Sequence, residues 1–227
     1  MIKKFMLVAA MLISAKVFAQ DQPCAKALQE STKKMDQIQL AGQLVNYGYD
    51  TKSALPIIQA IKIYQDLNVI EANDGRKPKT KADEEVTVNI TKEDQPVRNM
   101  SQLFDDATAF ANGDKNLLAL IDGCKKASTQ RDPVGGPIDR FFRIPARSTQ
   151  EWVVTLHGGE RTGIVVSGDG TTDLDVYIYD YNGNLIVSDI TYGDQCSFFV
   201  DVFYTSDFTI RVVNRGYVYN DYELFVF

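Results

Sequence analysis

The sequence predicts an α+β chain in two parts: an N-terminal helical bundle followed by an all-β, jelly-roll-like sandwich. The composition changes near Gln130. Residues 20–130 contain 14 Lys and Arg and 16 Asp and Glu with helical spacing, whereas residues 131–227 contain seven Arg, no Lys and 14 acids. The second part also holds 17 of the 24 aromatic residues. Because aromatic and β-branched residues favour strands, this part is predicted to be a sheet domain.

Residues 1–19 are predicted to be a signal peptide. Lys3 and Lys4 precede a short apolar run, and Ala19 offers a small residue at a cleavage point before Gln20. The apolar run is too short to favour a membrane span. We therefore expect an exported protein, periplasmic or extracellular, whose net charge changes from −6 to −9 when three lysines leave with the peptide. An acidic chain argues against nucleic acid and against anionic membrane surfaces as partners, because both require basic patches.

Residues 20–130 are predicted to form the helical domain, with a polar loop near 71–99. Helices are expected at 24–47, after Ser53, at about 101–112 and at 114–127. Ser101 and Asp114 are residue types that cap helix N-termini, and Gly113 separates the last two helices. The Pro- and Gly-rich stretch 131–138 is predicted to be a linker.

Residues 139–227 are predicted to form the β-sandwich domain. In the segment 173–180, Leu174, Val176 and Ile178 share one face, and Asn182-Gly183 then favours a hairpin turn. Eight short strands at this spacing indicate a jelly-roll or Greek-key sandwich. The expected strands are 139–144, 150–156, 161–167, 173–180, 184–189, 196–203, 207–213 and 219–226. The expected core residues are Trp152, Leu174, Ile178, Phe208, Ile210 and Leu224.

Three motifs resemble the bacterial pre-peptidase C-terminal domain: Asp173-Leu-Asp-Val-Tyr-Ile-Tyr-Asp with Asn-Gly-Asn-Leu-Ile after it, Asp207-Phe-Thr-Ile-Arg-Val-Val, and Tyr222-Glu-Leu. The resemblance covers roughly residues 140–227. It implies a secreted β-sandwich that accompanies exported enzymes and has calcium-binding relatives. The arrangement with a helical front half is also similar to that of uncharacterised exported bacterial proteins.

The second part is rich in aspartate near predicted strand ends. Calcium takes six to eight oxygen ligands, and loops of Asp, Asn and Gly supply them. The candidate ligands are Asp169, Asp173, Asp175, Asp189 and Asp194, and calcium is the only cofactor that the sequence suggests. The alternative is a solvated rim whose Asp side chains accept hydrogen bonds from turn amides.

The sequence offers little support for catalysis. His157 is the only histidine, and no G-x-S-x-G motif provides a serine nucleophile. Glycoside hydrolysis requires only two carboxylates, a requirement too weak to serve as a signal among 14 acids. We therefore predict no catalytic residues and no enzyme activity.

Three cysteines permit one disulfide and one free thiol. Export makes a bridge plausible. Cys24 opens the first predicted helix and Cys124 lies in the last, so we predict that these two pair and that Cys196 stays free.

Several tyrosines are predicted to be exposed on the sandwich, and they allow either a sugar- or protein-binding face or pairing across strands. They are Tyr177, Tyr179, Tyr181, Tyr217 and Tyr219. The partner is accordingly expected to be an unknown protein or a glycan, with no nucleic acid and no membrane span.

The sequence supports three functional hypotheses. The first is an exported, non-catalytic binding or structural protein with a calcium-capable sandwich. The second is a secreted hydrolase with an unrecognised carboxylate site. The third is a helical scaffold that docks a partner protein while the sandwich serves stability or export.

Overall fold

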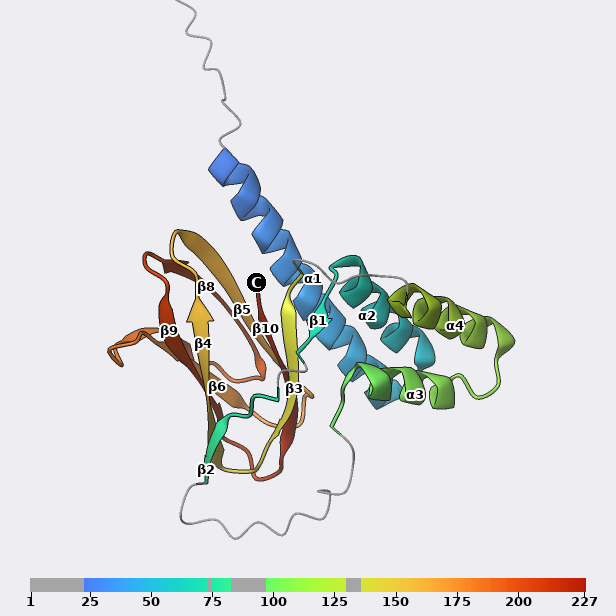
Figure 1. Ribbon diagram of the computed structural model, residues 1–227. Coiled ribbons are helices and arrows are strands. Elements are labelled where there is room, and N and C mark those ends of the chain that lie inside the picture. The colour runs from blue at the N-terminus through green and yellow to red at the C-terminus, as the bar shows by residue number, and fades with distance from the viewer. Residues whose placement is uncertain (1–22, 73–74, 83–96, 130–135) are drawn as a thin grey trace, which may run out of the picture.

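The computed structural model describes residues 23–72, 75–82, 97–129 and 136–227 (Figure 1). It confirms an α+β architecture, with four helices in the N-terminal half of the described chain followed by two five-stranded sheets. The predicted signal peptide, most of the predicted linker and much of the predicted polar loop lie outside the described residues.

The four helices follow the predicted order. Asn99, rather than the predicted Ser101, caps the third helix, because its side chain accepts a hydrogen bond from the Gln102 amide. Asp114 caps the fourth helix as predicted and accepts hydrogen bonds from the amides of Asn116 and Leu117. The helices are α1 (Pro23–Thr51), α2 (Ala54–Asp66), α3 (Met100–Phe110) and α4 (Lys115–Thr129).

All eight predicted strands are present in the sandwich, each within two residues of its expected ends. They are β3 (Ile138–Ile144), β4 (Ser148–Leu156), β5 (Glu160–Gly168), β6 (Leu174–Tyr179), β7 (Leu185–Asp189), β8 (Gln195–Val202), β9 (Ser206–Asn214) and β10 (Asn220–Val226). Successive strands alternate between the two sheets except at the β6–β7 hairpin. This connectivity is that of a jelly roll.

Two further strands come from the region predicted to be a polar loop. β1 (Ile70–Glu71) pairs in parallel with β3, and β2 (Lys79–Ala82) pairs antiparallel with β4. The first sheet therefore has the order β1-β3-β10-β5-β8, and the second sheet has the order β2-β4-β9-β6-β7. The helical half of the sequence thus contributes one strand to each sheet of the sandwich (Figure 1).

The space between the two sheets is filled by apolar side chains, as the alternating pattern predicts. The six expected core residues are all buried there: Trp152, Leu174, Ile178, Phe208, Ile210 and Leu224. Trp152 also donates a hydrogen bond from Nε1 to the Tyr222 hydroxyl at 2.7 Å, and this bond joins β4 to β10 across the sandwich.

Helices α1 and α2 pack against the outer face of the first sheet, and α3 and α4 lie beyond them (Figure 1). Val165 and Phe225, which point out of the sandwich, share an apolar cluster with buried residues of α1 and α2. Gly42 of α1 lies so close to the sheet that a Cβ atom there would fall 2.1 Å from the Ser167 Oγ. The helical half and the sandwich are therefore packed directly together.

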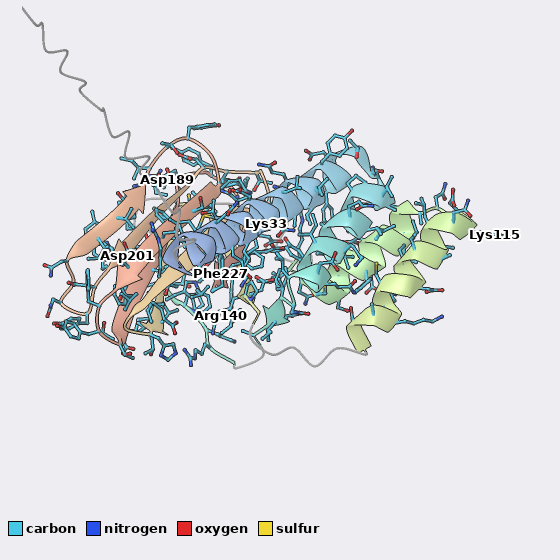
Figure 2. The ribbon with its side chains drawn as sticks, turned by 90° about the horizontal axis from the view of Figure 1, so that it is seen from above. Lys33, Lys115, Arg140, Asp189, Asp201 and Phe227 are labelled. Atoms are coloured by element: carbon cyan, nitrogen blue, oxygen red, sulfur yellow. The ribbon has the colours of Figure 1, made fainter. Side chains whose placement is uncertain are left out.

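Polar contacts also cross this interface. Gln39 donates to the Ser197 hydroxyl at 3.1 Å, and Asn46 donates to the Gly168 carbonyl at 2.9 Å. The bundle extends beyond the edge of the sandwich, with Lys115 at its far end (Figure 2). None of the helices in the described residues is both long enough and apolar enough to cross a membrane.

Candidate binding surface

The aspartates predicted to bind calcium accept hydrogen bonds from nearby turns. Asp169 and Asp189 each accept from the backbone amide and the hydroxyl of a threonine two residues later. Asp173 accepts from the Gly193 amide at 2.7 Å. These contacts correspond to the alternative predicted for the rim, in which the carboxylates stabilise turns.

Asp194 is buried at the same rim and holds two loops together. Its Oδ2 accepts from the Gly170 amide at 2.6 Å and from the Asn220 side chain at 3.1 Å. Burial raises the pKa of its carboxyl, although these hydrogen bonds act in the opposite direction. Within residues 23–72, 75–82, 97–129 and 136–227, no three His, Cys, Asp or Glu side chains gather in an arrangement that could hold a metal ion.

Asp175 lies apart from the other four, on the outer face of the second sheet. Its Oδ2 accepts from Nε of Arg215 at 2.6 Å, and the Tyr177 hydroxyl lies 3.2 Å away. The structure therefore places this predicted metal ligand in an arginine and tyrosine cluster.

Tyr177 of that cluster also belongs to a row of side chains that crosses the whole second sheet. The strand registers place Lys79, Glu151, Arg211, Tyr177 and Ser188 side by side on β2, β4, β9, β6 and β7. Because residues that are paired between strands share one face of a sheet, these five side chains all point away from the sandwich core.

Two of the predicted exposed tyrosines stack on this face. The rings of Tyr177 and Tyr179 are 6.5 Å apart between centroids with an angle of 22° between their planes. Arg211 lies across the strand pair with its guanidinium 4.7 Å from the Tyr179 ring centroid. Both tyrosines are half-buried, so the ring pair is a preformed aromatic surface.

The two arginines on this face are each held by a carboxylate. Arg211 donates to Glu151 from Nε at 2.8 Å and to the Tyr179 hydroxyl from Nη1 at 3.0 Å. Arg215 donates to Asp175 as described, and to the Tyr177 hydroxyl at 3.2 Å. These bonds fix the guanidinium planes beside the tyrosine rings.

The face is hollowed into an open groove of about 680 Å³. Lys79 and Lys81, both exposed, form one side of this groove, and Arg211, Arg215, Tyr177 and Tyr179 form its floor and other side. We call this site the tyrosine–arginine groove. Four cationic side chains and one acidic side chain, Glu151, line it, although the whole chain is acidic.

The remaining predicted tyrosines lie outside the groove. Tyr219 stacks beneath the Arg143 guanidinium at 4.1 Å, and Tyr217 lies 5.7 Å from that of Arg147. Tyr181 is exposed in the β6–β7 turn. The predicted tyrosine face is therefore reduced to Tyr177 and Tyr179.

Neither the single histidine, His157, nor Cys196 lines the tyrosine–arginine groove. His157 is exposed in the turn after β4. Cys196 is buried, and burial together with nearby aspartates raises the pKa of its thiol to about 12. Because the thiolate is the reactive form, this cysteine is inert at neutral pH.

Cys124 is buried and carries no disulfide in this structure. The side chain of its predicted partner, Cys24, lies outside the described residues, so the Cys24–Cys124 bridge stays a prediction.

No family model matches the sequence, and no curated protein matches it. Similar solved structures include the pre-peptidase C-terminal domain of a Bacillus anthracis collagenase, the family that the strand motifs resemble. It is 11% identical over 38% of this chain and 87% of that domain, with a TM-score of 0.31.

Another is PliG of Aeromonas hydrophila, a periplasmic inhibitor of g-type lysozyme, which is 12% identical over 43% of this chain and 90% of its own, with a TM-score of 0.33. A third is a de novo designed double-stranded β-helix, which is 11% identical over 39% of this chain and 97% of the designed chain, with a TM-score of 0.27. At these scores the likenesses carry no argument about function.

Proposed function

We propose that this chain is an exported, non-catalytic binding protein that holds an anionic glycan in the tyrosine–arginine groove. The observation that carries the proposal is the stacked Tyr177–Tyr179 pair flanked by two arginines whose planes are fixed by carboxylates.

The tyrosine rings suit the apolar face of a sugar ring. Tyrosine supplies a large, stiff contact area together with a hydroxyl, and the two hydroxyls here already bond to arginine. Since the rings and guanidinium groups are held before a ligand arrives, binding costs little ordering entropy.

The charge of the groove favours a ligand with carboxylate or sulfate groups. Arg211 and Arg215 each use Nε and Nη2 to hold a carboxylate, and the remaining N–H groups of each guanidinium can donate to such a ligand group. Lys79 and Lys81 add two positive charges on the exposed strand β2. The groove is positive although the chain as a whole is acidic. An anionic ligand is therefore attracted to the groove and repelled by the rest of the protein surface.

The same contacts argue against hydrolysis at this site. A glycosidase needs one carboxyl group that is free to give up a proton and a second that acts as base or nucleophile. Glu151 accepts from Arg211 at 2.7 Å and Asp175 accepts from Arg215 at 2.6 Å. Both carboxylates therefore serve to position arginines.

The proposal predicts that the protein binds oligogalacturonate or a sulfated heparin oligosaccharide, and binds methyl-esterified oligogalacturonate more weakly. Tyr177→Ala is expected to weaken binding of the charged probe about tenfold, or ~1.4 kcal/mol, because it removes half of the ring pair. Arg211→Lys keeps the charge but loses the planar guanidinium that Glu151 and Tyr179 hold in place, and a several-fold loss of affinity is expected. Isothermal titration calorimetry at two salt concentrations measures both effects.

Tyr192→Ala is the matched control, because Tyr192 is 95% exposed and does not line the groove. It should bind the charged probes as the unaltered protein does. Equal affinity for the charged and the esterified probe, or no effect of Tyr177→Ala, would contradict the proposal.

Calcium binding at the rim remains a proposal from the sequence. If an ion binds Asp169 and its neighbours, it must replace the hydrogen bonds that these carboxylates accept. Because an ion bound only by the folded state stabilises it, melting in calcium and then in EDTA tests the proposal. A higher melting temperature in calcium supports it, and coincident melting curves refute it.

Export is part of the same proposal and is supported by residues 1–19 of the sequence. Sequencing the N-terminus of the mature protein from fractionated cells is expected to find Gln20.

A further inference from the structure

The outer face of the second sheet continues beyond the tyrosine–arginine groove, on the side of the molecule away from the helices (Figure 1). A second row of side chains crosses this face at the next outward-pointing position along each strand. Its members are paired in the strand registers: Val153 of β4, Thr209 of β9, Tyr179 of β6 and Leu185 of β7. We call it the apolar row.

The apolar row is open to solvent at both ends. Val153 is 50% exposed and Leu185 is 52% exposed. Ile186, which the register shift between β6 and β7 leaves unpaired beside Leu185, is 49% exposed. Tyr179 and Thr209 are half-buried between the two ends, and Tyr179 also lines the groove. The row and the groove therefore share one wall, and a ligand that covers the row gains free energy by removing apolar surface from water.

Charge is distributed unevenly on the two sides of the apolar row. The neighbouring row on the groove side contains Arg211, with Lys79 at its end on β2. On the other side the next paired position holds Thr155 and Asp207, whose carboxylate accepts the threonine hydroxyl at 2.7 Å. Asp180, in the β6–β7 turn, is a second carboxylate at this end of the sheet. The negative groups of a ligand that lies across both rows must therefore face the groove, and the groups that cover the apolar row must be neutral.

We propose that the anionic glycan carries acetyl groups and that the apolar row selects for them, an inference that rests on the function proposed above. The sugar ring stacks on Tyr177 and Tyr179, and its carboxylates face the arginines and lysines of the groove. The acetyl methyl groups lie against Val153 and Leu185. An acetyl group is neutral and small, so the carboxylates beyond the row do not repel it, whereas a free hydroxyl group gains nothing from an apolar surface.

The narrowness of the apolar row argues for a small substituent. A specific protein–protein interface buries about 800 Å² on each partner. The apolar row is one side chain wide and is bounded by the charged groove on one side and by Asp207 on the other. It therefore offers too little apolar area for a protein partner, and it suits short acyl groups on a ligand that the groove already holds.

The test compares probes of equal charge that differ only in their acyl groups. The first pair is O-acetylated oligogalacturonate without methyl esters and the same preparation after mild alkaline deacetylation. The second pair is an oligosaccharide of alternating glucuronate and N-acetylglucosamine and its N-formyl counterpart, which lacks one methyl group per disaccharide. We expect the acetylated member of at least one pair to bind the full chain about fourfold more tightly for each methyl group that is buried. Calorimetric titration measures this ratio, and a preference within the first pair assigns an ester, whereas one within the second assigns an amide.

Val153→Thr and Leu185→Thr are each expected to bring the ratio of the two affinities closer to one. Threonine is well suited to a strand, so both variants keep the fold. Val218→Thr is the matched control, because Val218 is 53% exposed in the loop between β9 and β10 and does not line the groove. This control should retain the full preference for the acetylated probe.

The possible results distinguish this inference from the function on which it rests. If the charged probes bind and Tyr177→Ala weakens their binding, but neither acetylated probe is preferred, the acetyl proposal is overturned and the glycan-binding proposal stands. A preference that persists undiminished in both Val153→Thr and Leu185→Thr also overturns the acetyl proposal, because the acetyl groups are then recognised elsewhere. If no probe binds, both proposals fail.

Discussion

Glu223→Gln is expected to stabilise the protein above pH 7 by an amount on the order of 3 kcal/mol relative to its effect near pH 4. Glu223 is buried between α2 and the first sheet, where its Oε2 accepts the Tyr64 hydroxyl at 2.6 Å. Burial raises the pKa of Glu223 from 4.5 to about 7, while Tyr64 and Arg98 act in the opposite direction. Glutamine keeps the acceptor and removes the charge.

The sign follows from proton binding. Between pH 4.5 and about 7 the folded state keeps a proton on Glu223 that the unfolded chain has lost. The free energy of unfolding therefore falls as pH rises through this window, and the contribution is fully present below pH 4.5. Asp139, whose pKa is raised by burial and by Glu223, extends the loss to higher pH.

Urea unfolding of the unaltered protein and the variant from pH 4 to pH 8 measures the difference directly. Glu160→Gln is the matched control, because Glu160 is exposed at the start of β5, and its stability should follow that of the unaltered protein. A difference between Glu223→Gln and the unaltered protein that does not change with pH would show that the pKa of Glu223 is the same in the folded and unfolded states, and it would contradict the prediction.

Tyr222→Phe is expected to lower the free energy of unfolding by about 2–4 kcal/mol, although it removes a single oxygen atom. The Tyr222 hydroxyl accepts from Trp152 at 2.7 Å and donates to Gln150 Oε1 at 2.8 Å. Gln150 in turn donates to the Arg143 carbonyl at 2.9 Å. Phenylalanine leaves two buried polar groups without partners in the sandwich core.

Denaturant unfolding at one pH is sufficient to test this second expectation. Tyr192→Phe, at a fully exposed position, should change stability by less than ~0.5 kcal/mol. A loss for Tyr222→Phe as small as that of the control would mean that water or rearranged side chains satisfy Trp152 and Gln150.

The strands of the sandwich could be predicted because their signals are local. Alternation in the segment around Leu174 and Ile178 and the Asn182-Gly183 turn determine β6 and β7 from neighbouring residues. β1 and β2 gave no such signal. β1 has two residues, and all four residues of β2 are exposed, so both form through backbone pairing with strands about 70 residues away.

The candidate sites could likewise be predicted only where their signals are local in the sequence. The aspartate-rich turns were visible in the sequence, but a threonine two residues after Asp169 and after Asp189 already satisfies each carboxylate locally. Alternation along the strand places Tyr177 and Tyr179 on the outer face, where the structure has them half-buried, whereas Arg211 reaches them only through the pairing of β6 with β9.

The contribution of β1 and β2 to the sheets also bears on solubility. Without them, β3 and β4 would be edge strands, and unpaired backbone groups along an edge recruit strands from other molecules. β2 instead presents a short edge with Lys79 and Lys81, whose charges oppose such addition. A sandwich cut from its helices would thus lose the two segments that keep one copy from polymerising with the next.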